Sequence, residues 1–197
     1  MEGTSLIVLA GGKSSRMKTN KAFLPIGNAP LIETIIHKLR DSFQEIIVVT
    51  NDAPLYSHLK VRTITDIIPK QGPLSGIHAG LIASKFNYSF ILACDMPFVN
   101  APLSSYLVRQ AEGCDVVVPV ISGFYETTCA VYSKNCLPYI ESNLKRGVRK
   151  VLDFYRNVKV LAVYEKELSR YCKVDQAFLN LNTPHDYKLA QRIIATG

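Results

Sequence analysis

Four positively charged side chains follow a pair of glycines near the start of the chain. A glycine pair lets backbone N–H groups turn toward a ligand, because no Cβ atom blocks the approach. Cations this closely spaced suit the phosphates of a triphosphate or of its pyrophosphate product. A solvated basic loop around a turn is the alternative that the pattern leaves open. The residues are Gly11, Gly12, Lys13, Arg16, Lys18 and Lys21.

The spacing of these residues excludes two common phosphate loops. A Walker A motif ending in Gly12-Lys13-Ser14 would need a glycine at position 7, which is Ile7. A dinucleotide-binding GxGxxG motif starting at Gly11 would need a glycine where the chain has Lys13. The loop therefore predicts a phosphate site of another type.

An acidic residue, Asp95, follows the apolar segment 88–93 after a single cysteine. A carboxylate at the end of a buried strand is unfavourable unless it is solvated, paired or bound to a cation. Mg²⁺ is typically held by one or two carboxylates together with substrate phosphates. A turn formed with Met96 and Pro97 is the other interpretation of this segment.

Other polar residues and glycines fall where predicted strands end or helices begin. At Asn51 and Asp66, an amide can read a base edge and a carboxylate can hold a ring N–H or a hydroxyl. The segment 71–76 contains glycines and precedes a helical pattern, whose N-terminus attracts anions. Asn180 and Asn182 lie in a segment where strand alternation directs both to the same side. Each of these residues is also a common turn or cap residue.

Short apolar runs alternate along the chain with helical patterns, and the residues described above lie at the ends of these segments. The runs are continuous and rich in β-branched residues, which is typical of parallel strands covered on both faces. This alternation predicts an open, mostly parallel α/β/α sheet, in which ligands bind beyond the carboxyl ends of the strands. The predicted strands are residues 5–10, 45–50, 61–65, 88–93 and 115–120, and the predicted helices are residues 31–40, 74–86 and 102–112.

The regular alternation of strands and helices changes after residue 120. We expect strands at residues 126–132 and 158–163, with helices at residues 134–143 and 148–155 between them. An extended segment follows at residues 177–181, and then a helix at residues 185–194 with Thr183 as its N-cap. There is no linker or internal repeat, so residues 1–197 are predicted to form one domain. Its nucleotide-binding half is about residues 1–100, and its acceptor-binding half is about residues 101–197.

Composition narrows the class of protein. The chain has 197 residues, of which 48% are hydrophobic and 20% are charged, as in a globular protein. No apolar run reaches the ~18–20 residues of a membrane span, and the N-terminus lacks the basic region of a signal peptide, so we expect a cytoplasmic protein. The net charge of +7 comes from scattered cations without interleaved aromatic residues. It therefore favours a polyanionic small molecule over nucleic acid.

A family resemblance is carried by the segment LAGGKSSRMKTNKAFLPIGNAPLIE. It resembles the signature of the nucleotidyltransferases with a Rossmann-like fold, and its doubled glycine is most similar to the molybdenum cofactor guanylyltransferase branch, called MobA. The motifs GPLSG, CDMP and NLNTP follow in the order of that family. The chain departs from it at Lys18, where glycine is usual, and at Glu126-Thr127, where His-Pro or a similar pair is frequent.

The resemblance implies a reaction and its participants. GMP would pass from GTP to the terminal phosphate of molybdopterin or its molybdenum-loaded form, with Mg²⁺ or Mn²⁺ as the cofactor and pyrophosphate as the product. Lys21, Arg16 and Asp95 would be catalytic, with Asp95 as the metal ligand and Asn182 as a further candidate. Transient contacts with cofactor-biosynthesis and molybdoenzyme-chaperone proteins are also implied. The implied nucleotide-binding residues are Leu9, Ala10, Gly11, Gly12, Lys13, Lys21, Asn51, Asp66, Gly72, Pro73, Leu74, Gly76 and Asp95, and the implied acceptor-binding residues are Arg149, Asn180 and Asn182.

Two other functions stay open from the sequence. One is a cytidylyltransferase that acts on molybdopterin or another phosphorylated small molecule. The other is a non-catalytic nucleotide-binding adaptor, against which the joint presence of Lys21 and Asp95 argues, because a mere binder need not keep both.

Overall fold

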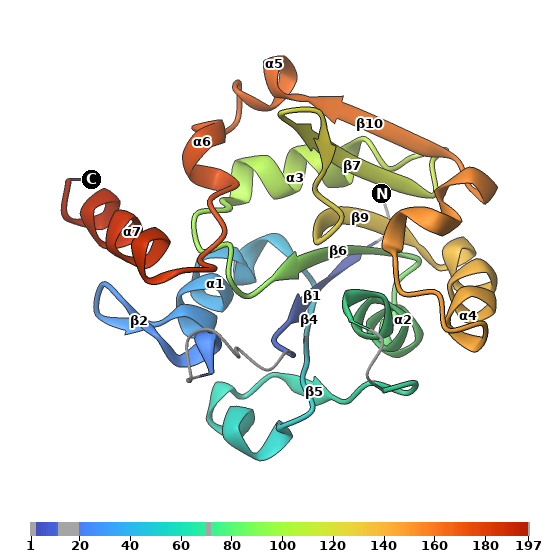
Figure 1. The fold of residues 1–197 in the computed structure, drawn as a ribbon, viewed down its shortest axis with the longest axis horizontal. Coiled ribbons are helices and arrows are strands. Elements are labelled where there is room, and N and C mark those ends of the chain that lie inside the picture. The colour runs from blue at the N-terminus through green and yellow to red at the C-terminus, as the bar shows by residue number, and fades with distance from the viewer. Residues whose placement is uncertain (1–2, 12–19, 70–71, 197) are drawn as a thin grey trace.

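A computed structural model describes residues 3–11, 20–69 and 72–196 of the chain. Its centre is a mostly parallel sheet with helices on both faces (Figure 1). The strands are β1 (Thr4–Leu9), β4 (Glu45–Val49), β5 (Arg62–Ile64), β6 (Tyr88–Ala93), β7 (Val116–Ile121), β8 (Phe124–Tyr125), β9 (Cys129–Ser133) and β10 (Val160–Tyr164), with a separate ribbon of β2 (Pro25–Ile26) and β3 (Ala29–Pro30).

The order across the sheet is β10-β7-β9-β6-β1-β4-β5, and β8 pairs with β7. The pairs of β1 with β4 and β6, of β4 with β5 and of β7 with β10 are parallel. The strand β9 lies between β6 and β7 and is antiparallel to both, and β8 is antiparallel to β7. The predicted open, mostly parallel α/β sheet is confirmed.

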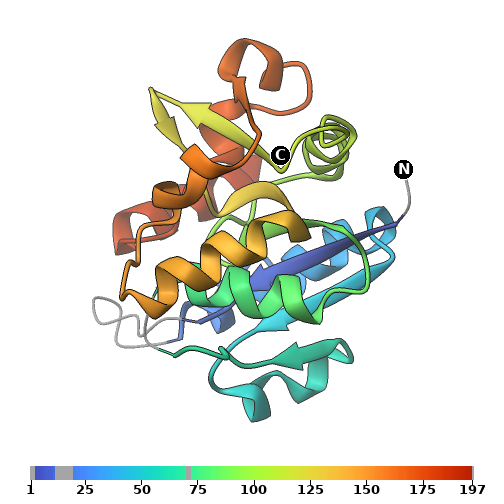
Figure 2. The same ribbon diagram turned by 90° about the vertical axis from the view of Figure 1, so that its right-hand side faces the viewer.

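Helices cover the two faces of the sheet. The helices α1 (Leu31–Leu39) and α3 (Ala101–Arg109) pack on one face. The helices α2 (Pro73–Ala83) and α4 (Leu137–Lys145) pack on the other, which faces the viewer in Figure 2, together with the 3-10 helix η5 (Val151–Asn157). The remaining helices are α5 (Glu165–Leu168), α6 (Val174–Ala177), α7 (Pro184–Thr196) and the 3-10 helices η1 (Lys21–Phe23), η2 (Arg40–Ser42), η3 (Ala53–Leu59) and η4 (Lys134–Cys136).

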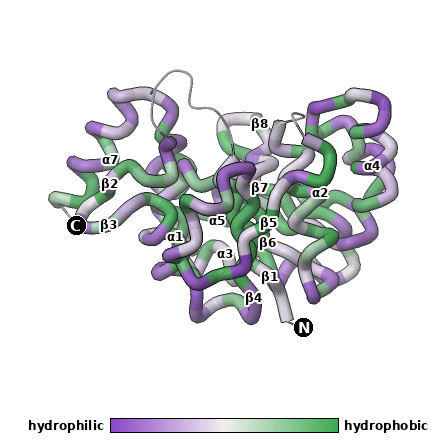
Figure 3. Tube along the Cα trace, turned by 90° about the horizontal axis from the view of Figure 1, so that it is seen from below, coloured by the Kyte–Doolittle hydropathy of each residue, from purple (hydrophilic) through white to green (hydrophobic). Residues whose placement is uncertain are grey.

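The central strand β1 shows why the buried runs are continuously apolar. Leu6 and Val8 belong to the hydrophobic cluster beneath α1 and α3, whereas Ile7 belongs to the cluster beneath α2 and α4. Because successive side chains of a strand point to opposite faces, a strand that is covered on both faces must be apolar at every position. Figure 3 shows the same arrangement, with apolar strands inside and hydrophilic segments on the outer surfaces.

Close contact between α2 and β1 depends on Gly80. A Cβ atom at this position would lie 2.6 Å from Cγ2 of the buried Ile7, well inside van der Waals contact. The glycine therefore lets α2 settle on the sheet. This places the amino end of α2 beside the strand ends where ligands bind in such folds.

Three predicted segments differ in the structure. The strand expected from residue 126 begins at Cys129, because the Cys129 N–H donates to the Glu126 carbonyl (3.0 Å) and closes a turn. The helix expected at residues 148–155 is the 3-10 helix η5. The extended segment expected at residues 177–181 is the end of α6 followed by a loop.

The closing helix α7 begins as predicted. Thr183 Oγ1 accepts from the Asp186 N–H (3.2 Å), and Asp186 Oδ2 accepts from the Thr183 N–H (2.7 Å), which is a reciprocal cap. Leu181 and Ala190 pack with Ile26 and Leu31 into a third apolar cluster. This cluster joins the end of the chain to the segment that follows the glycine-rich loop. Among the described residues, no helix has both the length and the apolar character to cross a bilayer.

Candidate active site

Three side chains from distant parts of the chain meet where β1 and β6 end. Lys21 Nζ donates to Asn182 Oδ1 at 2.8 Å and lies 3.7 Å from Asp95 Oδ2. Lys21 and Asp95 are mostly buried, with side-chain exposures of 17% and 21%. A lysine held between an amide and a carboxylate is a fixed positive charge, which can stabilise phosphate oxygens.

The position of Lys21 is set locally by Asn20. The Asn20 side chain accepts from the Ala22 N–H (3.1 Å) and caps η1, the short helix on which Lys21 lies. The same amide donates to the hydroxyl of Tyr56 (3.1 Å) on η3. Tyr56 in turn donates to the Ala10 carbonyl (3.1 Å), immediately after β1.

Tyr56 was not identified from the sequence, and its role depends on these contacts. It is buried, and burial raises the pKa of its hydroxyl, so the group stays protonated. The hydroxyl joins the residue before the glycine-rich loop to the residue after it. A tyrosine in an apolar stretch gives no signal of such a bridge, so the sequence offered no means of finding it.

Asp95 lies at the end of β6 in a site that disfavours its charge. Burial raises the pKa of the Asp95 carboxyl, and the ammonium of Lys21 partly offsets this effect. The Asp95 carbonyl accepts from the Leu181 N–H at 2.9 Å, which anchors the closing loop beside the site. This backbone bond holds Asn182, the next residue, close to Lys21. The segment is a loop, so the strand alternation expected from the sequence does not place this side chain.

Oxygen donors around Lys21 fit a hard divalent cation. The donors are the Asp95 carboxylate and the Asn182 amide oxygen, and the cation that the structure describes beside that carboxylate is Lys21, whose Nζ lies 3.7 Å from Oδ2. No cluster of three or more histidine, cysteine or acidic side chains suited to a metal exists within the described part of the chain. The donor set therefore suits an ion whose shell is completed by substrate phosphates and water, which is the usual coordination of Mg²⁺.

A second carboxylate, Glu126, also lies near Asp95. The sequence had marked it only as a departure from the His-Pro pair that is frequent in the family. Burial raises the pKa of the Glu126 carboxyl, and the negative charge of Asp95 raises it further. The Glu126 N–H donates to the Pro119 carbonyl (2.9 Å), so the turn is fixed to the end of β7. The turn that closes β8 onto β9 therefore borders the same strand ends.

The predicted nucleotide side is organised around Asn51 and Asp66. Asn51 Nδ2 donates to Asp66 Oδ2 (3.1 Å), and the Asp66 N–H donates to Asn51 Oδ1 (3.4 Å). A Cβ atom added to Gly76 would lie 3.0 Å from Leu9 Cδ2 and 3.8 Å from Asp66 Oδ1. The structure thus brings together Leu9, Asn51, Asp66 and Gly76, as the sequence predicted for the carboxyl ends of neighbouring strands.

Backbone geometry explains the glycine before α2. Gly72 has a φ of +71°, which favours glycine, and Pro73 follows in the first turn of the helix. Leu74 is buried in the core beneath α2, so it anchors the helix from inside. At the amino end of α2 the Ser75 N–H donates to the Gly72 carbonyl (3.2 Å), and the positive end of the helix dipole faces this edge.

Other predicted site residues stand apart from this arrangement. Gly12, Lys13 and Arg16 lie outside the described residues, while Gly11 is exposed and described. Arg149 is exposed, and no described residue pairs with it. Asn180 Nδ2 donates to the Phe178 carbonyl (3.4 Å), which is a local contact, so the structure does not bring this amide to Lys21.

Comparison with known proteins agrees with this geometry. The family model described as a MobA-like NTP transferase domain matches residues 6–160. A probable molybdenum cofactor guanylyltransferase from Pelotomaculum thermopropionicum is 39% identical over 180 residues, covering 91% of this chain and 88% of that protein. A second one, from Carboxydothermus hydrogenoformans, is 35% identical over 195 residues, covering 99% and 98%. The crystal structure of molybdopterin-guanine dinucleotide biosynthesis protein A from Archaeoglobus fulgidus has a TM-score of 0.87 at 28% identity, covering 98% of this chain and 100% of that one.

Proposed function

Because this chain belongs to the family of MobA-like NTP transferase domains, we propose that it transfers GMP from GTP to molybdopterin and releases pyrophosphate. The product is molybdopterin guanine dinucleotide. The observation that carries the proposal is the convergence of Lys21, Asp95 and Asn182 where β1 and β6 end. Nucleotide transfer needs fixed positive charge at this place, which a structural ion pair on the surface would not supply.

The reaction is a displacement at the α-phosphorus of GTP. An oxygen of the acceptor's terminal phosphate forms a bond to that phosphorus. The bond from the phosphorus to the bridging oxygen breaks, and its electron pair leaves with pyrophosphate. The attacking oxygen is already anionic, so no general base is needed, and catalysis rests on positioning and on neutralising charge.

Among the residues that the structure describes, Lys21 neutralises the negative charge of the leaving pyrophosphate. Its ammonium is held by Asn182 beside Asp95, so it does not have to reorganise as charge moves onto the leaving pyrophosphate. Lys13 and Arg16 complete this group in the proposal, since they belong to the same basic loop. Gly11 and Gly12 give the phosphates access to the backbone, and the amino end of α2 adds a favourable dipole.

Mg²⁺, with Mn²⁺ as a substitute, is the proposed cofactor, held by Asp95 and by the amide oxygen of Asn182. When bound, it supplies positive charge to the nucleotide phosphates. The raised pKa of Asp95 supports this assignment, because a carboxylate whose charge is disfavoured by burial gains from a second cation beside Lys21.

The two halves of the domain divide the substrates in this proposal. Asn51 and Asp66 bind the base, and their mutual hydrogen bonds hold both side chains ready at one edge. Arg149, Asn180 and Asn182 bind the acceptor, with the exposed guanidinium of Arg149 contacting its phosphate. Delivery of the product to chaperones of molybdoenzymes follows from the proposed activity.

Release of pyrophosphate tests the proposal. The purified protein is supplied with molybdopterin, Mg²⁺ and each of GTP, CTP, ATP and UTP, and binding of each nucleotide is measured by titration calorimetry. We expect turnover and tight binding with GTP, loss of both in Asp95→Ala, and no change in Asp41→Ala, an exposed control carboxylate on η2.

Other outcomes point to other functions. A preference for CTP would identify a cytidylyltransferase. Nucleotide binding without any transfer would favour an adaptor. If the folded protein neither bound nor turned over any of the four nucleotides, the assignment of the site would be wrong.

A further inference from the structure

An exposed aromatic ring lies on the other side of β6 and β1 from Asn51 and Asp66 in the order of the sheet. Tyr125 lies on β8, where it pairs with Val120 at the end of β7, and 43% of the residue is exposed. Because β7 and β6 are both antiparallel to β9, they point the same way and end at the same edge of the sheet. In Figure 3, β8 lies at the edge opposite the N-terminus, which is the edge where β1 ends.

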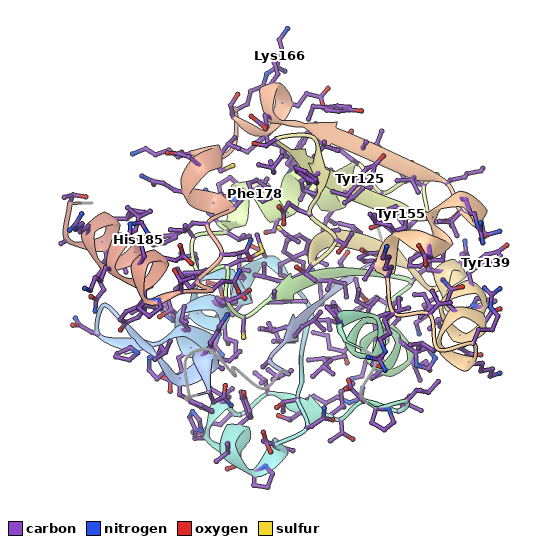
Figure 4. The ribbon with its side chains drawn as sticks, in the orientation of Figure 1. Tyr125, Tyr139, Tyr155, Lys166, Phe178 and His185 are labelled. Atoms are coloured by element: carbon purple, nitrogen blue, oxygen red, sulfur yellow. The ribbon has the colours of Figure 1, made fainter. Side chains whose placement is uncertain are left out.

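The ring of Tyr125 is held by a second tyrosine. It meets the ring of Tyr155 edge to face, with centroids 5.9 Å apart and planes at 74° (Figure 4). Phe154 packs against Tyr155 in the same manner, at 5.2 Å and 76°. Edge-to-face packing of this kind orients a ring while leaving much of its own face uncovered.

Hydrogen bonds fix Tyr155 to the loop next to Asp95. Tyr132 donates its hydroxyl proton to the Thr127 carbonyl (2.7 Å), so Tyr155 is the donor in the 2.8 Å bond between the two hydroxyls. The neighbouring Thr128 carbonyl accepts from the Ala93 N–H (2.8 Å), at the end of β6. The aromatic group and Asp95 are therefore tied to the same short turn.

Two exposed cations precede the helix that carries Tyr155. Arg149 and Lys150 are exposed and lead directly into η5, the helix that carries Tyr155. Aromatic faces and exposed cations are the groups that bind planar heterocycles carrying phosphate.

We propose that Tyr125, supported by Tyr155, is the surface on which the flat heterocyclic ring of the acceptor stacks while its phosphate reaches the Lys21–Asp95 centre. This inference rests on the proposed function, because it places the pterin of molybdopterin on the acceptor side. It assigns a binding role to a residue outside the four sequence motifs. It also gives the site two ends, with the base at Asn51 and the pterin at Tyr125.

Steady-state kinetics separates this role from a general one. The variants are Tyr125→Ala, Tyr125→Phe and Tyr139→Ala, the last being a matched control because Tyr139 is 40% exposed on the outer side of α4 (Figure 4). We expect Tyr125→Ala to raise the KM for molybdopterin by about tenfold and to leave the KM for GTP unchanged, since stacking is lost at one substrate only. Tyr125→Phe keeps the ring and stays within about twofold of the wild type, as does Tyr139→Ala.

A direct binding measurement keeps this test independent of turnover. Pterins fluoresce, and the chain contains no tryptophan, so the emission of 6-hydroxymethylpterin reports its binding without interference. We expect the wild type and Tyr125→Phe to quench this emission and Tyr125→Ala to lose the quenching. If the wild type quenches through Tyr125 but transfers no nucleotide, the proposed function fails and the stacking surface stands.

The contrary results are equally distinct. An unchanged KM for molybdopterin together with unchanged pterin quenching in a folded Tyr125→Ala protein would overturn the proposal. So would a rise in the KM for GTP alone, because the ring would then belong to the nucleobase. A similar effect in Tyr139→Ala would show that any exposed tyrosine has it. Thermal melting of each variant shows that the fold is intact.

Discussion

The two ends of the site are built from different kinds of contact. On the nucleotide side, polar groups are bonded to one another before any ligand arrives, as in the pairs Asn51–Asp66 and Tyr56–Ala10. On the acceptor side, the exposed groups are an aromatic ring and a cation, Tyr125 and Arg149. One side is organised in advance, and the other offers open surface.

The two kinds of contact predict different selectivity for the base and for the acceptor ring. Fixed donors and acceptors reject a base that leaves them unpaired, so they select strongly. An exposed ring and a cation recognise planarity and charge, which many heterocyclic phosphates share. Selectivity for the nucleotide is therefore expected to exceed selectivity for the acceptor ring, and the following variants test or refine this contrast.

The largest effect is expected at Lys21, on which both sides depend. In Lys21→Met we expect kcat to fall by about 10²–10³-fold, because a preorganised charge facing the transition state is lost. Lys166→Met is the control, since Lys166 projects away from the protein on α5 (Figure 4). Pyrophosphate release measures both. A loss of less than about threefold in Lys21→Met would place the decisive charge elsewhere.

Asp95→Asn is expected to lower activity while raising stability. Removing the carboxylate should lower kcat by about 10²-fold, because it removes the proposed metal ligand. The raised pKa of Asp95 means that the ionised carboxylate costs stability above that pKa. This cost disappears below the unfolded pKa, where the group is protonated in both states. Melting curves should therefore show a more stable variant at pH 8 and almost no difference at about pH 3, below the unfolded pKa.

Wild-type activity should fall as the pH drops through the raised pKa of Asp95, since the proposed metal ligand then becomes neutral. The same pH series on Asp41→Asn gives the control, because that carboxylate is exposed. A variant Asp95→Asn that is less stable than the wild type at pH 8 would show that the contact with Lys21 outweighs the burial of charge.

Tyr56→Phe tests the organised side by removing one hydroxyl. We expect a loss of about 1–3 kcal/mol in the free energy of unfolding, because the Ala10 carbonyl and the Asn20 amide lose a buried partner. We also expect kcat to fall by about tenfold, since Asn20 positions the helix that carries Lys21. Chemical denaturation and steady-state kinetics measure the two effects.

Tyr88→Phe is the matched control for Tyr56→Phe. The Tyr88 hydroxyl donates to the Cys114 carbonyl (3.3 Å), away from the site. This variant should lose stability and keep kcat. Equal changes of kcat in the two variants would show that the hydroxyl bridge at Tyr56 has no special role in positioning.

Arg149→Ala tests the open side and should have the smallest effect. We expect the KM for the acceptor to rise by about threefold to tenfold, because one exposed cation contributes modestly to phosphate binding. The rise should shrink as salt is added, since exposed charges are screened. Arg109→Ala, an exposed control at the end of α3, should leave the KM unchanged. A change in the KM for GTP instead would reverse the assignment of the two sides.

Much of the fold was predictable because its strands are covered on both faces. The run at residues 88–93 was predicted with the bounds that β6 has in the structure, and the parallel strands β1, β4, β5 and β7 agree within one residue. Such strands must be apolar throughout, so their pattern is visible without any partner. The cap at Thr183 was predictable for a similar reason, since capping is decided within one turn.

Prediction failed where long-range contacts decide the backbone. The segment before Cys129 has the composition of a strand, yet Glu126 bonds to Pro119 on β7 and the chain then turns, with the Cys129 N–H bonded to the Glu126 carbonyl. The segment before Asn182 also has an apolar pattern. It forms no strand, because its only sheet-like anchor among the described residues is the bond from Leu181 to Asp95. In both cases the local pattern allowed two conformations, and tertiary hydrogen bonds selected one.

The order of the elements and the candidate residues that they carry were both visible in the sequence alone. Lys21, Asp95 and Asn182 were singled out from their residue types and from their places in motifs that resemble those of the nucleotidyltransferase family. Only the tertiary structure decided that the ammonium of Lys21 lies 2.8 Å from an amide 161 positions away. It alone also decided that the rings of Tyr125 and Tyr155 meet beside the same turn. The pattern of residues along a segment reflects how that segment is buried. Contacts between distant segments depend instead on where the packed helices and strands end in space.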